Sequence, residues 1–363
     1  MKKPRKASKR TKKAAATAAA PEPVTLAQVK AMLNAKPAPR RSLGAKVGVA
    51  QASAGSVAIE RKKLIIQRRL DNKARVHDYK AMMEIMKKRG VKGLASKTVD
   101  APKRRAPGAA KAPSTAPLQI FAEGDSWFDY PVPFFGGGVI PRLEDRLGVP
   151  ILNLAKAGDE VRFMLGVEER KILEKQLRQG CPAGGLWDVL LFSGGGNDIV
   201  DKPMALWVRD FNPSVPSAKL IHQTRYDAAL ALVQAGYEDL IALRDELSPD
   251  THLVFHAYDF AIPDGRGICH LGPWMKPTFD LRKFPSASTS AFEVVKEMLT
   301  QLATMLTTLE RNHNRVTFIR SQGTLAPGTS SWHNELHPSK DGFKSFARVF
   351  HEKLKAMFPN RVL

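Results

Sequence analysis

After residue 117 the sequence alternates short apolar runs with longer segments of helical periodicity, and this pattern sharply limits the folds open to the chain. Alternating strand and helix signals are typical of repeated βα units, which build a parallel sheet covered by helices. The runs are 118–122, 150–154, 187–192, 252–257 and 316–319, and the helical segments are about 137–147, 160–180, 222–247, 288–312 and 340–357. The last four runs are continuously apolar, as expected of strands buried on both faces. The sequence therefore predicts one α/β domain of three layers, α/β/α, with a five-stranded parallel sheet.

The first 117 residues have a different composition. They hold 30 Lys and Arg against 6 Asp and Glu, whereas the rest of the chain holds 27 basic and 29 acidic residues. Residues 1–23 are rich in Lys, Ala and Pro and have no means of building a core. Residues 59–89 lack proline and glycine and carry apolar residues at loosely helical spacing. We therefore expect a basic, largely disordered region at 1–117 with a helix at 59–89, followed by a folded domain at 118–363.

The sequence offers little sign of a membrane span, a signal peptide or a metal site. No apolar run approaches the roughly 20 residues needed to cross a bilayer, and the alanine tract at 14–20 is a poor signal-peptide core. A cytoplasmic protein is expected, with secretion by an unconventional route left open. Cys181 and Cys269 form neither a disulfide framework nor a metal-ligand pair, so no metal and no cofactor are expected.

Four polar segments each lie where a strand ends or a loop begins, which is where open α/β sheets collect chemistry. The first, Gly124-Asp125-Ser126, follows the first apolar run, and on its own it is also an ordinary turn sequence. Gly158 follows the second run, Asn197 follows the third, and His337 precedes the last helical segment. Together these residues could supply a nucleophile, oxyanion donors and a general base.

In this order the four segments resemble the blocks of the SGNH/GDSL hydrolases, and the resemblance covers about residues 118–357. It implies a flavodoxin-like sheet and a serine hydrolase that cleaves carboxylic esters, as esterases and lipases do. It also implies that Ser126 attacks the carbonyl to form an acyl-enzyme and that His337 is the base. The backbone N–H groups of Ser126 and Gly158, with the Asn197 side chain, would then form the oxyanion hole.

One position departs from the pattern of that family. Where the family has an Asp three residues before the catalytic histidine, this chain has Asn334. An amide oxygen can still hold the ring of His337, but it carries no charge to stabilise an imidazolium. Three arrangements stay open: a Ser-His-Asn triad, a replacement acid such as Glu335, and a Ser-His dyad oriented by a backbone carbonyl. The alternative to an enzyme is a catalytically quiet binding protein on the same scaffold.

Aromatic residues cluster around the candidate serine. Trp127, Phe128 and Tyr130 follow it directly, and further aromatic residues stand in the segment 260–287. They predict a substrate pocket with apolar walls, suited to the acyl group of a lipid or of an acylated carbohydrate. The sequence makes no prediction of the oligomeric state.

The positive charge of residues 1–117 would attract any dense polyanion, and such binding would weaken with salt. No known DNA- or RNA-binding motif is present, so contact with nucleic acid would be independent of sequence. For an acyl hydrolase an anionic membrane is the more economical partner, because polycation and substrate would meet at one surface. A solubilising tail without a specific partner is the simpler alternative.

Overall fold

A five-stranded parallel sheet forms the centre of the protein. The structure, a computed structural model, describes residues 24–34, 54–89, 117–130, 137–268, 271–286 and 288–362. Within these ranges the strands are β1 (Ile120–Gly124), β2 (Ile151–Asn153), β3 (Val189–Ser193), β4 (His252–His256) and β5 (Val316–Ile319), in the order β2-β1-β3-β4-β5. This is the flavodoxin-like strand order, and it confirms the predicted fold class.

The order of the strands creates a crevice at one edge of the sheet. The chain runs from β1 outward to β2 and then returns to β3 on the other side of β1, so β1 and β3 are neighbours, with Gly124 paired to Ser193. Open α/β sheets bind ligands at the carboxyl ends of the strands, where the strand order reverses in this way. The segments that follow β1 and β3 carry Ser126 and Asn197, so both lie at this crevice.

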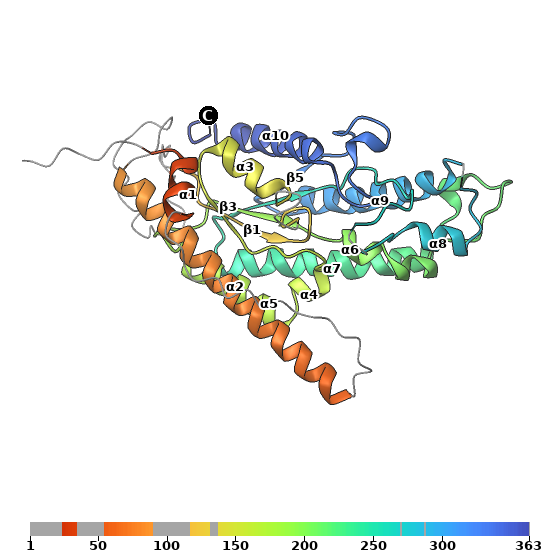
Figure 1. Cartoon of the computed structure of the whole chain (residues 1–363), viewed down its shortest axis with the longest axis horizontal. Helices are drawn as coiled ribbons and strands as arrows, with labels where there is room; N and C mark the ends of the chain where they lie inside the picture. Colours follow the sequence, from red (N-terminus) through yellow and green to blue (C-terminus); the bar gives the residue numbers. More distant parts are fainter. Residues whose placement is uncertain are drawn as a thin grey trace, which may run out of the picture.

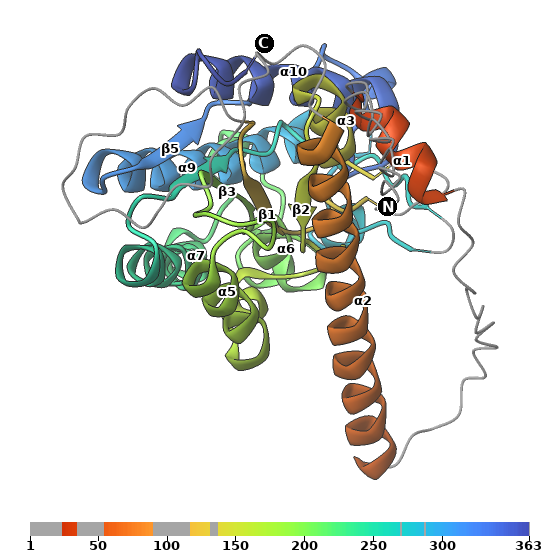
Figure 2. The same cartoon turned by 90° about the vertical axis from the view of Figure 1, so that its left-hand side faces the viewer.

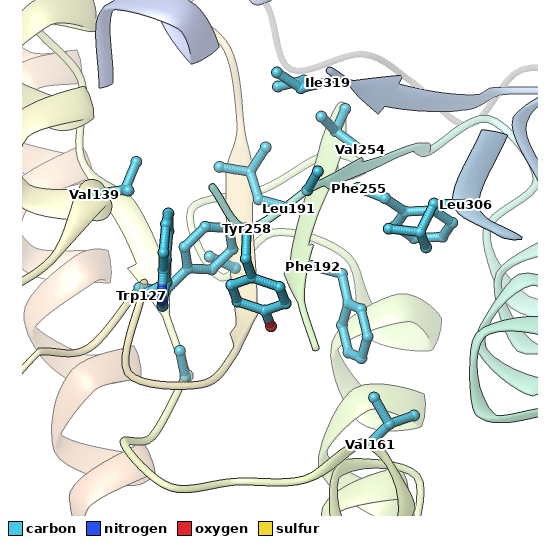
Figure 3. Packing of buried hydrophobic residues seen from close by; sticks show 14 of the residues in the cluster. Trp127, Val139, Val161, Leu191, Phe192, Val254, Phe255, Tyr258, Leu306 and Ile319 are labelled. Atoms are coloured by element: carbon cyan, nitrogen blue, oxygen red, sulfur yellow. The ribbon is translucent and has the colours of Figure 1, made fainter. Parts of the chain in front are cut away.

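The sheet is buried on both faces, which explains the continuously apolar runs. Side chains alternate across a strand. Leu191 and Val254 accordingly lie on one side of the sheet, and Phe192 and Phe255 lie on the other, beside Leu306 (Figure 3).

Helices cover both faces of the sheet (Figure 1). One face is covered by α3 (Val139–Leu147) and α10 (Lys340–Met357), and the other by α4 (Val161–Met164), α5 (Val167–Gln179), α7 (Gln223–Leu247) and α9 (Ser290–Asn312). Shorter elements in the connections are α6 (Gly196–Ile199), α8 (Lys276–Leu281), and the 3₁₀ helices η1 (Lys202–Leu206), η2 (Ser217–Lys219) and η3 (Thr329–Ser331). In α10, Phe343, Phe346 and Phe350 recur at helical spacing and are all buried, which docks this helix against the sheet.

The basic N-terminal region contributes two helices, α1 (Leu26–Asn34) and α2 (Ala54–Arg89). The helix predicted at 59–89 is thus present and slightly longer. It runs beside β2, the edge strand of the sheet (Figure 2). Its Tyr79 is buried in the main core against Trp187, with ring centroids 5.6 Å apart. The part of α2 from Arg68 to Tyr79 is therefore packed on the folded domain, and the expected domain boundary at 117 does not separate this part of the helix from it.

The remaining stretches for which disorder was predicted, including 1–23, lie outside the described residues. Among the helices that the structure describes, none is both long enough and apolar enough to cross a membrane.

Candidate active site

The turn after β1 places Ser126 at the end of the strand, where its side chain is 7% exposed. A Cβ at Gly124 would lie 2.6 Å from the carbonyl oxygen of Ser193, so only glycine lets β1 and β3 approach this closely. The Asp125 carboxylate accepts the Trp127 backbone N–H at 3.0 Å and the Ser193 hydroxyl at 2.8 Å. Burial raises the pKa of Asp125 to about 6. Asp125 thus shapes the turn, and Ser126 stands beyond it.

Ser126, His337 and Asn334 form a continuous row of hydrogen bonds. The Oγ of Ser126 lies 2.7 Å from Nε2 of His337, and Nδ1 of the same ring lies 3.0 Å from Oδ1 of Asn334. That amide oxygen also accepts the backbone N–H groups of Leu336 and His337, each at 2.9 Å, which fixes the orientation of the amide. Because an amide oxygen can only accept, Nδ1 carries the proton and Nε2 offers its lone pair to the serine hydroxyl.

Tyr130 contacts both His337 and Asn334 of this row. Its ring stacks on His337 with centroids 4.3 Å apart, and its hydroxyl accepts a hydrogen bond from Nδ2 of Asn334 at 3.0 Å. The same hydroxyl lies 3.0 Å from Nδ1 of His333. Tyr130 is only 2% exposed. The sequence placed it on a substrate pocket, whereas the structure places it against the imidazole and the amide.

The other two aromatic residues predicted to bind substrate also lie deeper than expected. Phe128 is fully buried, stacks on His256 at 5.4 Å between centroids, and packs against Phe350 of α10. The prediction for Phe128 is therefore wrong, because its ring packs in the core against His256 and Phe350. Trp127 is 4% exposed; it lines the cavity at the serine and donates its indole N–H to the carbonyl oxygen of Leu336 at 3.1 Å.

Burial controls the charge state of His337. Desolvation, with a smaller contribution from His333, lowers the pKa of His337 to about 3. The neutral amide of Asn334 supplies no negative charge to oppose this shift. The imidazole is accordingly neutral near pH 7 and free to accept a proton, but it is a weaker base than one whose pKa lies near the working pH.

Two of the three predicted oxyanion donors, Ser126 and Asn197, lie at one cavity. Ser126, Asn197 and His337 all line a cavity of about 30 Å³, which we call the serine cavity. One N–H of the Asn197 amide donates to the carbonyl oxygen of Asp159 at 2.8 Å, which leaves its second N–H for a ligand. Gly158, at φ 86°, stands next to Asp159 but does not line the serine cavity. Within the described part of the chain, the backbone N–H groups of Ser126 and Gly158 have no acceptor.

Glu335 does not serve as the replacement acid. It is fully buried, and its carboxylate accepts the backbone N–H groups of Gly265, Trp274, Met275 and Lys276 at distances of 2.6 to 3.0 Å. These four bonds occupy the lone pairs of both carboxylate oxygens. Of the three arrangements left open by the sequence, the hydrogen bonds match the Ser-His-Asn row.

Removing the Glu335 carboxylate should therefore destabilise the fold. Glu335→Ala is expected to lower the free energy of unfolding by about 3 kcal/mol, because each buried N–H left without an acceptor costs about 1–3 kcal/mol and part of the segment can relax. Urea unfolding measures the change. Glu352→Ala, at a side chain that is 60% exposed, is the control and should change stability by less than about 0.5 kcal/mol. Equal stabilities for the two variants would rule out this anchoring role.

A larger cavity of about 780 Å³ adjoins the serine cavity, and Asp259 lines both. We call it the aromatic cavity. Its walls come from the segment after β4, from α8, from the start of α9 and from the loop after β5, and include Phe260, Ile262, Phe279, Phe284, Phe292, Leu325 and Trp332. The sequence predicted that aromatic residues of segment 260–287 would surround the serine. It gave no signal for the contributions from α9 and from the loop after β5.

Within the described ranges, no group of three or more His, Cys, Asp or Glu side chains is arranged to hold a metal ion. Cys269, one of the two cysteines considered in the sequence, lies outside those ranges.

Comparisons with known proteins give matches only among solved structures; no protein-family model and no curated protein matches the chain. A lipase from a goat rumen metagenome is 16% identical over 65% of this chain and 96% of its own, with a TM-score of 0.41. An extracellular lipase from Streptomyces rimosus is 16% identical over 65% of this chain and 99% of its own, with a TM-score of 0.39. A family 3 carbohydrate esterase from Clostridium thermocellum is 14% identical over 67% of this chain and its full length, with a TM-score of 0.39. Likeness at this level assigns no activity to this chain, so its chemistry has to follow from its own residues.

Proposed function

We propose that the protein is a serine hydrolase that cleaves a carboxylic ester through an acyl-enzyme on Ser126. The observation that carries this proposal is the 2.7 Å separation between Ser126 Oγ and His337 Nε2, a nitrogen that Asn334 fixes as a proton acceptor. A serine becomes a nucleophile when an adjacent base takes its proton. Hydrolysis of p-nitrophenyl esters by the wild type, compared with Ser126→Ala, tests the proposal.

In the first half of the reaction His337 takes the proton of Ser126 while Oγ attacks the ester carbonyl. The carbonyl oxygen becomes an oxyanion, for which the backbone N–H groups of Ser126 and Gly158 and the second N–H of Asn197 are the nearby donors. The C–O bond to the leaving group then breaks, and His337 returns the proton to the departing alkoxide. In the second half His337 activates a water molecule, which releases the acid and restores the serine.

Asn334 should determine which leaving groups the proposed enzyme cleaves efficiently. It keeps Nε2 of His337 directed at the serine, but it cannot stabilise the imidazolium by charge. Esters with good leaving groups, which need less help from a general acid, should therefore be cleaved faster than simple alkyl esters.

The aromatic cavity is the proposed site of the acyl group. It adjoins the serine cavity through Asp259, and its many aromatic and aliphatic walls favour a hydrocarbon chain over a charged phosphoester. An ester of a lipid or of an acylated carbohydrate carries such a group.

Filling the aromatic cavity should shorten the preferred acyl chain. Ala291 lines it at the start of α9. Ala291→Trp is expected to lower kcat/KM for p-nitrophenyl octanoate about tenfold, because the indole takes the space of the chain, while p-nitrophenyl acetate changes less than about twofold. Thr304→Trp, at an exposed position of the same helix, is the control. An equal loss on both esters would place the acyl chain elsewhere.

The proposed contact between the basic region and a polyanion falls mainly on residues outside the described ranges. On the described part, α2 presents exposed lysines at positions 73, 80, 87 and 88. We keep an anionic membrane as the proposed partner of this region, and retention on anionic vesicles that falls as salt rises is the expected result.

A further inference from the structure

We infer that two arginines of α2, Arg68 and Arg75, are positioning residues for two segments of the active site. These are residues 125–130, which carry Ser126 and are called the nucleophile turn, and residues 154–160, which carry Gly158 and are called the oxyanion turn. The inference rests on the proposed function for its kinetic consequences. Its structural basis is a stripe of α2 that packs on the domain. The sequence predicts this helix from its apolar and basic residues but does not single out the two arginines. Arg68, Asn72, Arg75 and Tyr79 follow one another at helical spacing and turn the same face toward the domain.

Arg68 inserts between three carboxylates beside the active site. Its guanidinium lies 2.5 Å from Asp159, 2.9 Å from Glu169 and 4.0 Å from Glu123. Its side chain is 11% exposed, and those of the three acids are 13%, 12% and 1% exposed. Ion pairs so shielded from water are stronger and less screened by salt than surface pairs.

Asp159 connects Arg68 to the oxyanion donors. Its carboxylate accepts from Arg68, and its backbone carbonyl accepts from Nδ2 of Asn197 at 2.8 Å. It also directly follows Gly158. A displacement of Asp159 would therefore move the Gly158 N–H and release the Asn197 side chain at the same time.

Arg75 ties the end of β2 to the nucleophile turn. One guanidinium nitrogen donates to the carbonyl oxygens of Asn153 and Ala155, at 3.0 and 2.8 Å, and the other donates to the carboxylate of Asp129 at 3.0 Å. The backbone N–H of Asp129 in turn donates to the carbonyl oxygen of Asp125 at 3.1 Å, which closes the turn that carries Ser126. Arg75 thus links the two loops directly.

Loss of Arg68 should displace Asp159 and, with it, the oxyanion turn. Burial already raises the pKa of Glu123 to about 8, and Arg68 is the cation that opposes this rise. Removing the guanidinium leaves Asp159 beside Glu169 and Glu123, with Lys156 of the same loop as the remaining cation that acts on Asp159 and Glu169. Repulsion and desolvation then favour a displaced or protonated Asp159, and the oxyanion donors lose their alignment.

The test compares Arg68→Met and Arg75→Met with Arg69→Met in the full chain. Arg69 is the matched control, because it lies on the same helix, is 60% exposed and pairs with Glu168 at the surface. We expect kcat for a p-nitrophenyl ester to fall about 10²-fold in Arg68→Met and about tenfold in Arg75→Met, with KM changed less than about twofold, because misaligned catalytic groups cost rate more than binding. Arg69→Met should match the wild type.

Two further conditions distinguish a loss of catalytic alignment from a loss of folded protein. Assays are run well below each variant's melting temperature, and Arg68→Ala is assayed with added guanidinium chloride, which should restore part of kcat, whereas equal sodium chloride should not. Wild-type kcat in Arg68→Met, or a loss equal to the unfolded fraction, would overturn the inference.

Hydrogen exchange tests the positioning role of Arg68 without relying on activity. Arg68→Met should speed exchange in peptides that cover 154–160 and 194–199, and Arg69→Met should not. If the wild type hydrolyses no ester, the proposed function fails, while this exchange pattern still supports the two arginines as supports of these loops. Unchanged exchange in Arg68→Met would contradict the positioning role, whether or not the wild type hydrolyses an ester.

Discussion

Ester hydrolysis is expected to fall by at least about 10⁴-fold in kcat when Ser126 is replaced by alanine, because no other group then forms the acyl-enzyme. His337→Ala should cost nearly as much, since the Oγ–H bond faces Nε2 of that ring at 2.7 Å. The double variant should be no worse than either single variant, because the two residues act as one unit. The measurement is kcat on p-nitrophenyl butyrate.

Ser345→Ala is the control for this series. Ser345 is half-buried on α10, and its hydroxyl donates to the carbonyl oxygen of Asp341 in the same helix. It should keep full activity. A Ser126→Ala variant that retains a tenth or more of the wild-type rate would disprove the serine mechanism.

Replacing Asn334 should produce the second large effect, in opposite directions for two substitutions. Asn334→Leu removes the acceptor that keeps the proton of His337 on Nδ1, and a base in the wrong tautomer cannot take the serine proton. We expect kcat to fall about 10³-fold, in line with the cost of tautomer loss in serine proteases. Leucine also leaves the backbone N–H groups of Leu336 and His337 without their acceptor, so melting temperatures must accompany the rates.

Asn334→Asp keeps the acceptor and adds a charge. It is expected to raise kcat about tenfold, a gain smaller than the tautomer effect because the wild type already holds the productive tautomer. The measurement that checks it is the pH profile of kcat/KM. The pKa of His337 in the wild type is lowered to about 3, so its acid limb should lie well below pH 6.5. In Asn334→Asp the limb should move to higher pH, because an anion stabilises the imidazolium. An unchanged limb would show that His337 is not the titrating base.

The same pKa shift has a consequence for stability. Between its lowered folded value and the unfolded value of 6.5, the unfolded chain binds a proton at His337 that the folded protein does not. The contribution of this residue to stability is therefore complete above about pH 6.5 and is lost as the pH falls. His256, whose pKa is lowered to about 4 by burial, acts in the same direction.

The sheet was predictable because its strands are continuously apolar and its connections repeat. The pairing of Ser126 with His337, 211 positions apart, was predictable only through the order of four short segments at strand ends. The partner of His337 could not be chosen from the sequence alone. Only the structure shows that the Glu335 carboxylate accepts four backbone N–H groups from the segment 265–276 and is therefore not available to the histidine.

The contribution of α2 to the active site was the feature least predictable from the sequence. The apolar residues of this helix, such as Tyr79 and Met86, give a weak helical periodicity, but nothing in that pattern marks the two arginines that share the packed face. The carboxylates that Arg68 meets stand 55 to 101 positions further along the chain. Phe128 shows the opposite limit. An aromatic residue beside a nucleophile can face a pocket or the core, and here Phe128 packs in the core against His256 and Phe350 of α10.

The most direct test of the proposed mechanism is covalent labelling of the folded wild-type protein with a fluorophosphonate, read by intact mass and peptide mapping. A serine reacts with this reagent only when a base activates it. The proposed mechanism predicts a single adduct on Ser126, absent from Ser126→Ala and formed far more slowly in His337→Ala. No adduct on Ser126, or equal labelling in His337→Ala, would contradict it.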